Sequence, residues 1–479
     1  MALAEPGIFF VGGRGNKAGD ANAGGGATKA AWEGDLNEDL ANVMGTNGEP
    51  LSDPDAWGGT GDACSVVEGN DGNVRIVVEG SGYFTNCKVG LVAHCVFEGV
   101  YDSGRYQVVA VDTTNGDWID IYETYTNNTV CDVKVGGAFD TLQNASDNVD
   151  ASSFDMEIRT NKDETSLAAT IDIDVGGGSA VSRTWKRIVG ADANGAELSD
   201  GNYIQYVQNA SRHVINITAN YVELAHLYPK DSQLHKGFTD GTTAILRDCK
   251  STGCSIAVQG FTRGYILGGY FSSINPAFLS DGVVATTAIG AEFYVSSADQ
   301  PVINAYRYGG MGGLTLVGCI IRKNGAGRGI QCAGSGACFN IINCVVYNAE
   351  DCIYIDSEDA IVRQYNNIFM VAAGASDKAI NLVKGNLQYS DYSCLWSVDD
   401  KTPSASNRWG YSDTPPNCIE QDPKFTDPAN GDFSLQSDSP CIDTGKPTLE
   451  GGYSTMGCWD DEHAGGGGGR RPRIRWHNV

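Results

Sequence analysis

The chain has 479 residues, 62 of them glycine, and a formal net charge of −26. A charge this negative argues against a protein that coats nucleic acid or binds anionic membranes. The hydrophobic fraction of 41% is too high for a fully disordered chain. No apolar run approaches the ~18 residues of a membrane-spanning helix. Composition therefore favours an acidic, glycine-rich and β-rich protein of two or three domains.

The first 60 residues are glycine-rich and include one candidate helix at 31–44. We predict an extended N-terminal arm with a short helix over 1–60. The first ten residues have neither the basic segment nor the apolar segment of a secretory signal. The sequence thus predicts folding in a reducing cytoplasm, where the 15 cysteines would be buried thiols rather than disulfides.

Residues 61–130 alternate between apolar and polar side chains, as half-buried strands do. The clearest cases are 74–78, 106–111 and 118–122, with glycine and Asn-Gly turns between them. This pattern predicts a small antiparallel β domain.

A repeat of 21–28 residues then dominates the chain, and such periods are typical of solenoids. Each copy has a polar or glycine residue followed by a residue expected to be buried, at the start of a short apolar strand. The copies begin at Asn220-Tyr221, Asp248-Cys249, Gly269-Tyr270, Ala291-Glu292, Gly318-Cys319, Asn343-Cys344, Asn367-Ile368 and Ser393-Cys394. Stacked coils would bury these faces and give each strand parallel partners. We expect Cys319, Cys344, Ile368 and Cys394 to point inward, one above another.

This pattern resembles the right-handed parallel β-helix, or pectate-lyase-like, superfamily. Two further segments strengthen the resemblance. The segment 136–146 is similar to the helix that opens many of these solenoids, and 422–445 is similar to a frequent closing segment. The resemblance implies an all-β chain with a right-handed parallel β-helix over 131–460. It implies little about activity, because this fold hosts lyases, hydrolases, adhesins and phage spikes.

The C-terminal residues 461–479 differ in character from the rest of the chain. Five glycines at 465–469 form a flexible linker, and the ten residues after it carry four arginines and no acidic residue. Alternation would place guanidinium groups on one side of an extended peptide and apolar anchors on the other. We predict that this tail docks on another polypeptide of the same assembly, through Arg470, Arg471, Arg473, Ile474, Arg475 and Trp476.

A search for catalytic chemistry gives only weak candidates. No carboxylate ladder for Ca²⁺ and no recognisable metal motif occurs, so no catalytic residue, metal site or cofactor is predicted. The densest acidic group surrounds one predicted strand, and solvated turn residues are its simplest interpretation: Glu350, Asp351, Asp356, Glu358 and Asp359. Trp396 and Trp409 are candidates for a sugar platform, although packing is the commoner role for such residues.

Taken together, the fold, the arms and the absent signal favour a structural virion protein of a tailed phage. Within that class we favour a capsid decoration or cement protein, without enzymatic activity, assembled in the host cytoplasm. Its partners would be capsid proteins or neighbouring copies of itself, as a homo-oligomer, with no nucleic acid and no membrane. The alternative is a phage tailspike or a secreted, extracellular β-helix protein that binds or cleaves polysaccharide.

Overall fold

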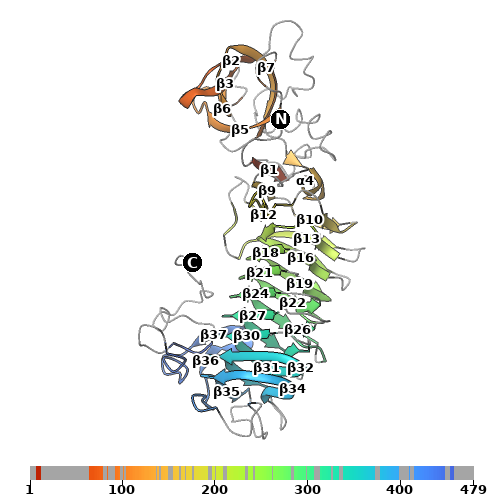
Figure 1. Cartoon of the computed structure of the whole chain (residues 1–479), viewed down its shortest axis with the longest axis vertical. Coiled ribbons are helices and arrows are strands. Elements are labelled where there is room, and N and C mark those ends of the chain that lie inside the picture. The colour runs from red at the N-terminus through yellow and green to blue at the C-terminus, as the bar shows by residue number, and fades with distance from the viewer. Residues whose placement is uncertain are drawn as a thin grey trace. The chain divides into compact units, whose positions relative to one another are not determined.

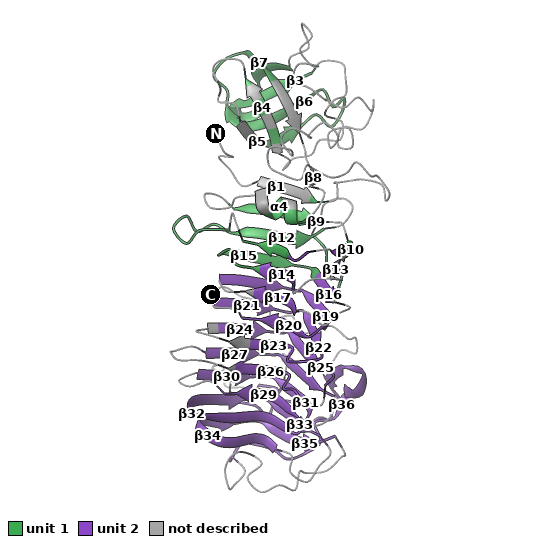
Figure 2. Ribbon diagram, turned by 90° about the vertical axis from the view of Figure 1, so that its right-hand side faces the viewer, with its two compact units in different colours: residues 1–164, 171–205, 217–227 green, residues 165–170, 206–216, 228–479 purple. Residues whose placement is uncertain are grey.

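The computed structural model describes residues 7–11, 64–148, 155–398, 409 and 415–457, with gaps inside these ranges. The gaps are 79–83, 85–91, 98–100, 102–103, 136–137, 140–141, 161–162, 168, 175–176, 192–196, 200, 209–212, 232–235, 241–242, 261–262, 282–284, 298, 307–312, 325–326, 334–337, 373–377 and 448–453. The chain forms two compact units (Figure 2). Unit 1 comprises 1–164, 171–205 and 217–227, and unit 2 comprises 165–170, 206–216 and 228–479.

Unit 1 contains a closed antiparallel barrel with the strand order β2-β3-β6-β5-β4-β7. Its strands are β2 (Cys64–Glu68), β3 (Asn73–Val77), β4 (Val92–Phe97), β5 (Gly104–Val111), β6 (Trp118–Thr124) and β7 (Thr129–Val135), with the short helix η1 (Asn70–Gly72) after β2. Alternate residues such as Val74 and Ile76 are fully buried inside it. The predicted antiparallel sheet is therefore confirmed.

Parallel strands form the rest of unit 1. They include β1 (Gly7–Val11), β8 (Ala138–Phe139), β9 (Met156–Thr160), β12 (Lys186–Gly190) and β15 (Val222–Ala225), and β9 pairs in register with β12 and β12 with β15. The helix predicted to open the solenoid is present as α4 (Leu142–Asn148). The buried ammonium group of Lys186 donates a hydrogen bond to the carbonyl of Ser146, in the last turn of α4. The chain also forms β10 (Glu164–Leu167), β11 (Ile171–Ile173), β13 (Ile204–Gln208) and β14 (His213–Ile217).

Unit 2 is a parallel solenoid of stacked turns (Figure 1). Three ladders of strands form its sides. The first ladder is β17 (Lys236–Asp240), β20 (Ile256–Gln259), β23 (Phe278–Asp281), β26 (Ile303–Tyr306), β29 (Arg328–Cys332), β32 (Asp351–Tyr365) and β34 (Lys378–Asp391). The second is β18 (Thr243–Arg247), β21 (Arg263–Leu267), β24 (Ala285–Ile289), β27 (Gly313–Val317) and β30 (Cys338–Ile342), continued by the later halves of β32 and β34.

The third ladder carries the predicted repeat. Its strands are β16 (Leu227–Asp231), β19 (Lys250–Cys254), β22 (Tyr270–Ser273), β25 (Glu292–Val295), β28 (Ile320–Lys323), β31 (Val345–Ala349), β33 (Ile368–Val371) and β35 (Cys394–Ser397). Phe271 and Phe293 stack inside with ring centroids 5.6 Å apart. The parallel solenoid is thus confirmed, while its right-handed sense stays a prediction. The first predicted repeat copy was misplaced, because β15 pairs with β12 and begins after Tyr221.

Of the four residues predicted to form one inward column, Cys319 and Cys344 do lie level, whereas Ile368 and Cys394 do not lie level with them. Val345 pairs in register with Ile368, and Ile368 with Cys394, so Cys344 lies level with Asn367 instead. Ile368 and Cys394 therefore point to the outer side of the ladder. Since side chains alternate along a strand, a shift of one residue reverses the face. Asn367 occupies the corner position that was expected for Ile368, and its side-chain oxygen accepts from the Cys344 amide at 2.8 Å.

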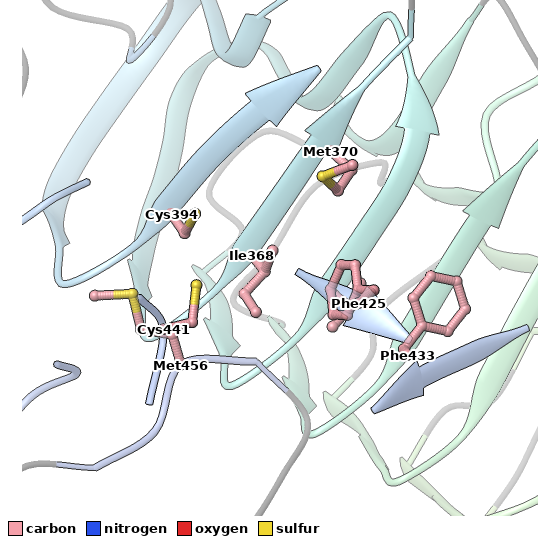
Figure 3. Packing of buried hydrophobic residues seen from close by; sticks show 8 residues of the cluster. Ile368, Met370, Cys394, Phe425, Phe433, Cys441 and Met456 are labelled. Carbon is pink, nitrogen blue, oxygen red and sulfur yellow. The ribbon is translucent and has the colours of Figure 1, made fainter. Parts of the chain in front are cut away.

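The outer side of the last turns is covered by the closing segment, which we define as residues 415–457. It contains the hairpin of β36 (Phe425–Asp427) and β37 (Asp432–Leu435), joined by η2 (Pro428–Asn430). Figure 3 shows Ile368, Met370 and Cys394 of the ladder facing side chains of this segment. The buried cluster consists of Val345, Ile368, Met370, Cys394, Phe425, Phe433, Cys441 and Met456. A layer of packing thus lies outside the solenoid core.

Candidate binding surface

The six predicted docking residues, Arg470 to Trp476, lie outside the described residues, as do the predicted arm helix and the glycine linker. The docking role of the tail therefore stays a prediction.

In the predicted acidic group around β32, Asp351 is buried and three other acidic side chains are exposed. Asp351 is buried at the start of β32, and its carboxylate accepts from the Asn381 amide at 3.0 Å. Burial, with a smaller contribution from Glu350, raises the pKa of Asp351 above its ordinary range. Asp356, Glu358 and Asp359 are exposed. Solvation therefore accounts for these three residues, but the interpretation as turn acids was wrong for Asp351.

The two tryptophans pack instead of forming a platform. Trp409 is 1% exposed, meets Phe369 edge to face, and donates to Glu420 at 2.9 Å. A single bridge pairs it with Ile380 at the last rung, so it closes the end of the core. Trp396 packs against the cluster under the closing segment. The sugar-platform interpretation is wrong for Trp409, because its ring is buried.

A different aromatic surface lies on the outer side of the third ladder. We call it the tyrosine strip, and it consists of Tyr228, Lys250, Tyr270, Glu292, Tyr294 and Arg322. Strand pairing places Lys250, Tyr270 and Glu292 in one column on successive turns. Tyr294 and Arg322 are paired in the neighbouring column. All six side chains are half-buried and point outward.

Cations hold the tyrosine rings of this strip in place. The Lys250 ammonium lies 4.7 Å from the ring centroid of Tyr228, and the Arg322 guanidinium lies 5.3 Å from that of Tyr294. Arg322 also donates to Glu292 at 3.0 Å. Burial, and then the carboxylate of Glu292, raise the pKa of Tyr270, so its hydroxyl stays protonated at neutral pH. The strip thus places tyrosine rings beside fixed cations.

The sequence reasoning missed this strip, although a usable signal was present. The repeat aligned Tyr270 and Glu292 as buried residues, whereas strand pairing places both on the outer side. Correct register would have placed Tyr270 and Glu292 in one outward column and Tyr294 and Arg322 in the next, since outward residues recur at every second position of a strand.

The described cysteines are thiols that do not form disulfides. Most are buried, including Cys319, Cys332 and Cys394 at 0% exposure. Burial raises the pKa of Cys418 to about 12 and moves that of Cys332 and Cys394 in the same direction. Because the thiolate is the reactive form, these groups are expected to be inert at neutral pH.

We therefore expect all 15 cysteines to titrate in denaturant alone, and addition of reductant to release no further thiol. In the native protein at pH 7, only a small fraction should react within minutes. Titration with a chromogenic disulfide in both states measures this. A gain of several thiols on reduction would mean that the protein folds in an oxidising compartment.

In the part of the chain that the structure describes, no cluster of His, Cys, Asp and Glu could hold a metal ion. No described helix is long and apolar enough to cross a membrane. Comparison with models of known protein families gives no match, and no curated protein matches the chain.

Proposed function

We propose that this chain is a structural protein of a tailed-phage particle, most specifically a capsid decoration or cement protein. The observation that carries the proposal is the set of buried thiols in a parallel solenoid. Extracellular proteins typically replace such thiols with disulfides, whereas a virion protein folds in the reducing host cytoplasm before release. Its partners would be capsid subunits or further copies of this chain.

The proposal includes membership of the pectate-lyase-like superfamily and a right-handed solenoid. The stacked coils, the opening helix α4 and the closing hairpin support this assignment. Parallel crossover connections are right-handed in nearly all known sheets, which favours the same sense here.

Deletion of residues 465–479 tests the proposed assembly role. We expect the truncated protein to keep the thermal midpoint of the full chain, because the deletion lies beyond the folded closing segment. Its incorporation into particles should be lost, because the arginines and Trp476 would no longer reach a neighbour. Quantitative gel analysis of purified particles, with the full chain as reference, measures occupancy. Unchanged occupancy at raised salt would contradict docking by the tail.

Glycan binding is the second candidate, and the tyrosine strip favours it. Aromatic faces beside charged side chains can stack on sugar rings and hydrogen-bond their hydroxyls. The cations Lys250 and Arg322 outnumber the one acidic side chain, Glu292, so an acidic polysaccharide fits better than a neutral one.

Replacing Tyr270 by Ala tests this second candidate. We expect binding of an acidic bacterial capsular polysaccharide to fall about tenfold or more, since aromatic stacking contributes roughly 1–3 kcal/mol where it has been measured on nucleic-acid bases. Tyr122 in the barrel is 49% exposed and lies outside the strip, so it serves as the control. Isothermal titration calorimetry gives both affinities. Equal binding by the two variants would exclude the strip as the glycan site.

A further inference from the structure

The outer side of the second ladder is free of charge over three successive turns. In β27, Leu314 and Leu316 are buried in the core, whereas Thr315 and Val317 point outward and stay half-buried. The outward residues of β24 to β30 with described side chains are Thr287, Ile289, Gly313, Thr315, Val317, Cys338, Asn340 and Ile342. On a chain of net charge −26, a neutral face is suited to protein contact, because interface cores are depleted in charge.

The order of residues in this face is self-complementary. One column reads Arg247, Leu267, Ile289, Val317, Ile342, Tyr365 and Asp391 on successive turns. Counted outward from Val317, isoleucine matches isoleucine. At the next two positions Tyr365 and Asp391 already contact the closing segment, since Lys446 lies 4.5 Å from the Tyr365 ring centroid and Asn417 donates to Asp391 at 2.8 Å. The neighbouring column reads Tyr265, Thr287, Thr315, Asn340 and Arg363. There Thr287 matches Asn340, and Tyr265 matches Arg363.

We propose that two copies of this chain pack antiparallel through this face, with a two-fold axis along β27. In a two-fold interface the same surface of each subunit is used, so residue i meets j and j meets i. Val317 and Thr315 then lie opposite their own copies, and Ile289 lies opposite Ile342 of the second copy. This inference does not depend on the proposed function.

The matched pairs supply both apolar and polar contacts. Tyr265 is 49% exposed in a single copy and would be covered by the exposed guanidinium of Arg363 from the second copy. Such a cation–π contact is favourable, and more so where water is excluded. Leu267, Ile289 and Ile342 would lose their remaining contact with water.

The charges favour this orientation over a parallel one. A rotation axis parallel to the solenoid, along the Thr315 column, would keep each residue of that column level with its own copy, so that Arg363 would meet Arg363. Like charges directly opposed cost stability. The antiparallel arrangement places Arg263 opposite Ile361, which pairs with Cys338 on the sixth rung of the same column.

Cross-linking through introduced cysteines tests the orientation. A Cys338→Ser background removes the half-buried thiol on this face. A bis-maleimide of about 10 Å suits the spacing of packed sheets. Thr315→Cys should cross-link to itself. Tyr265→Cys should not, since its copies would lie four rungs, or about 19 Å, apart along the stack. A mixture of Tyr265→Cys and Arg363→Cys chains should cross-link. Self-linking of Tyr265→Cys, or failure of Thr315→Cys, would overturn the proposal.

Val317→Arg tests the interface itself in the full chain. The substitution opposes two guanidinium groups at the axis, and we expect the dimer to weaken at least roughly a hundredfold. Light scattering should give twice the 50.7 kDa chain mass for the unaltered protein and one chain mass for the variant. The variant should keep the circular dichroism spectrum of the unaltered protein, because Val317 points away from the core, while its thermal midpoint should fall as the stabilisation from dimer formation is lost. Ser272→Arg on the third ladder is the matched control and should stay dimeric. A single-chain mass for the unaltered protein, or an unaffected Val317→Arg dimer, would contradict the inference.

Discussion

Ile368→Asp is expected to release the closing segment while leaving most of the solenoid folded. Ile368 is fully buried, but it points into the outer cluster and not into the solenoid core. The change removes an apolar side chain and buries a carboxylate without a partner, which should cost about 4 kcal/mol or more. The stability is lost from the packing of residue 368 against Phe425, Cys441 and Met456 of the closing segment.

Close packing around Ile368 explains why relaxation cannot remove this cost. Gly457 has a φ of +88°, and a Cβ added there would lie 2.8 Å from the Cδ1 of Ile368. The neighbouring Asn366 side chain accepts from the Lys446 amide at 2.6 Å and donates to Ser454 at 2.7 Å. A charge at 368 would separate these contacts.

Hydrogen exchange followed by mass spectrometry distinguishes this outcome from global unfolding. Peptides from 425–456 should exchange about a thousandfold faster in Ile368→Asp, which corresponds to ~4 kcal/mol. Peptides from β18 to β24 should keep their protection. Ile368→Val should change protection only slightly, and Ser272→Asp, an outward position on the same ladder, serves as the surface control. Equal loss in β18 to β24 would show that the closing segment and solenoid unfold together.

The sequence predicted the solenoid well because stacked coils impose a repeat that any single turn displays. Glycine-containing turns and apolar strands recur along the solenoid, so β19 to β35 lie where the repeat placed them. The register was harder. Both Cys344 and Val345 are buried, as are Asn367 and Ile368. When both faces of a strand are apolar, alternation gives no sign of which residue points inward.

That ambiguity has a physical cause in the closing segment. Its cluster buries the outer face of β31, β33 and β35, so these strands lack the polar outer residues of earlier turns. The tyrosine strip was missed for a different reason, because the repeat aligned two of its residues, Tyr270 and Glu292, as buried. Ser393 and Asn367 fill the corner positions through hydrogen bonds that a residue pattern does not predict.

In the barrel of unit 1, Asp120→Ala is expected to destabilise the β3–β6 pair by about 3 kcal/mol. Asp120 is fully buried, and both carboxylate oxygens are engaged by Arg75, at 2.6 and 2.9 Å. The Asn70 amide donates to the same carboxylate at 3.0 Å, which fixes the turn at η1. These hydrogen bonds raise the pKa of Arg75 further above its ordinary value.

Removing the Asp120 carboxylate leaves the Arg75 guanidinium without its ionic partner, so the loss of stability should be large. Arg75 keeps 20% of its side chain exposed and stacks on Trp118 at 3.6 Å, so water offsets part of the cost. For this reason we expect the lower end of the 3–5 kcal/mol range found for broken buried pairs. Gly69 lies close against this carboxylate, because a Cβ added there would lie 2.6 Å from the Asp120 Oδ1.

Replacing both partners together separates the ion pair from its surroundings. Arg75→Met with Asp120→Leu should be far less destabilising than Asp120→Ala alone, because no charge stays buried. Exchange of barrel peptides from 64–77 should accelerate about a hundredfold in Asp120→Ala. Peptides from unit 2 provide the internal reference and should keep their protection. If the double variant loses as much protection as Asp120→Ala, then packing around these side chains, and not the uncompensated charge, determines the stability of the barrel.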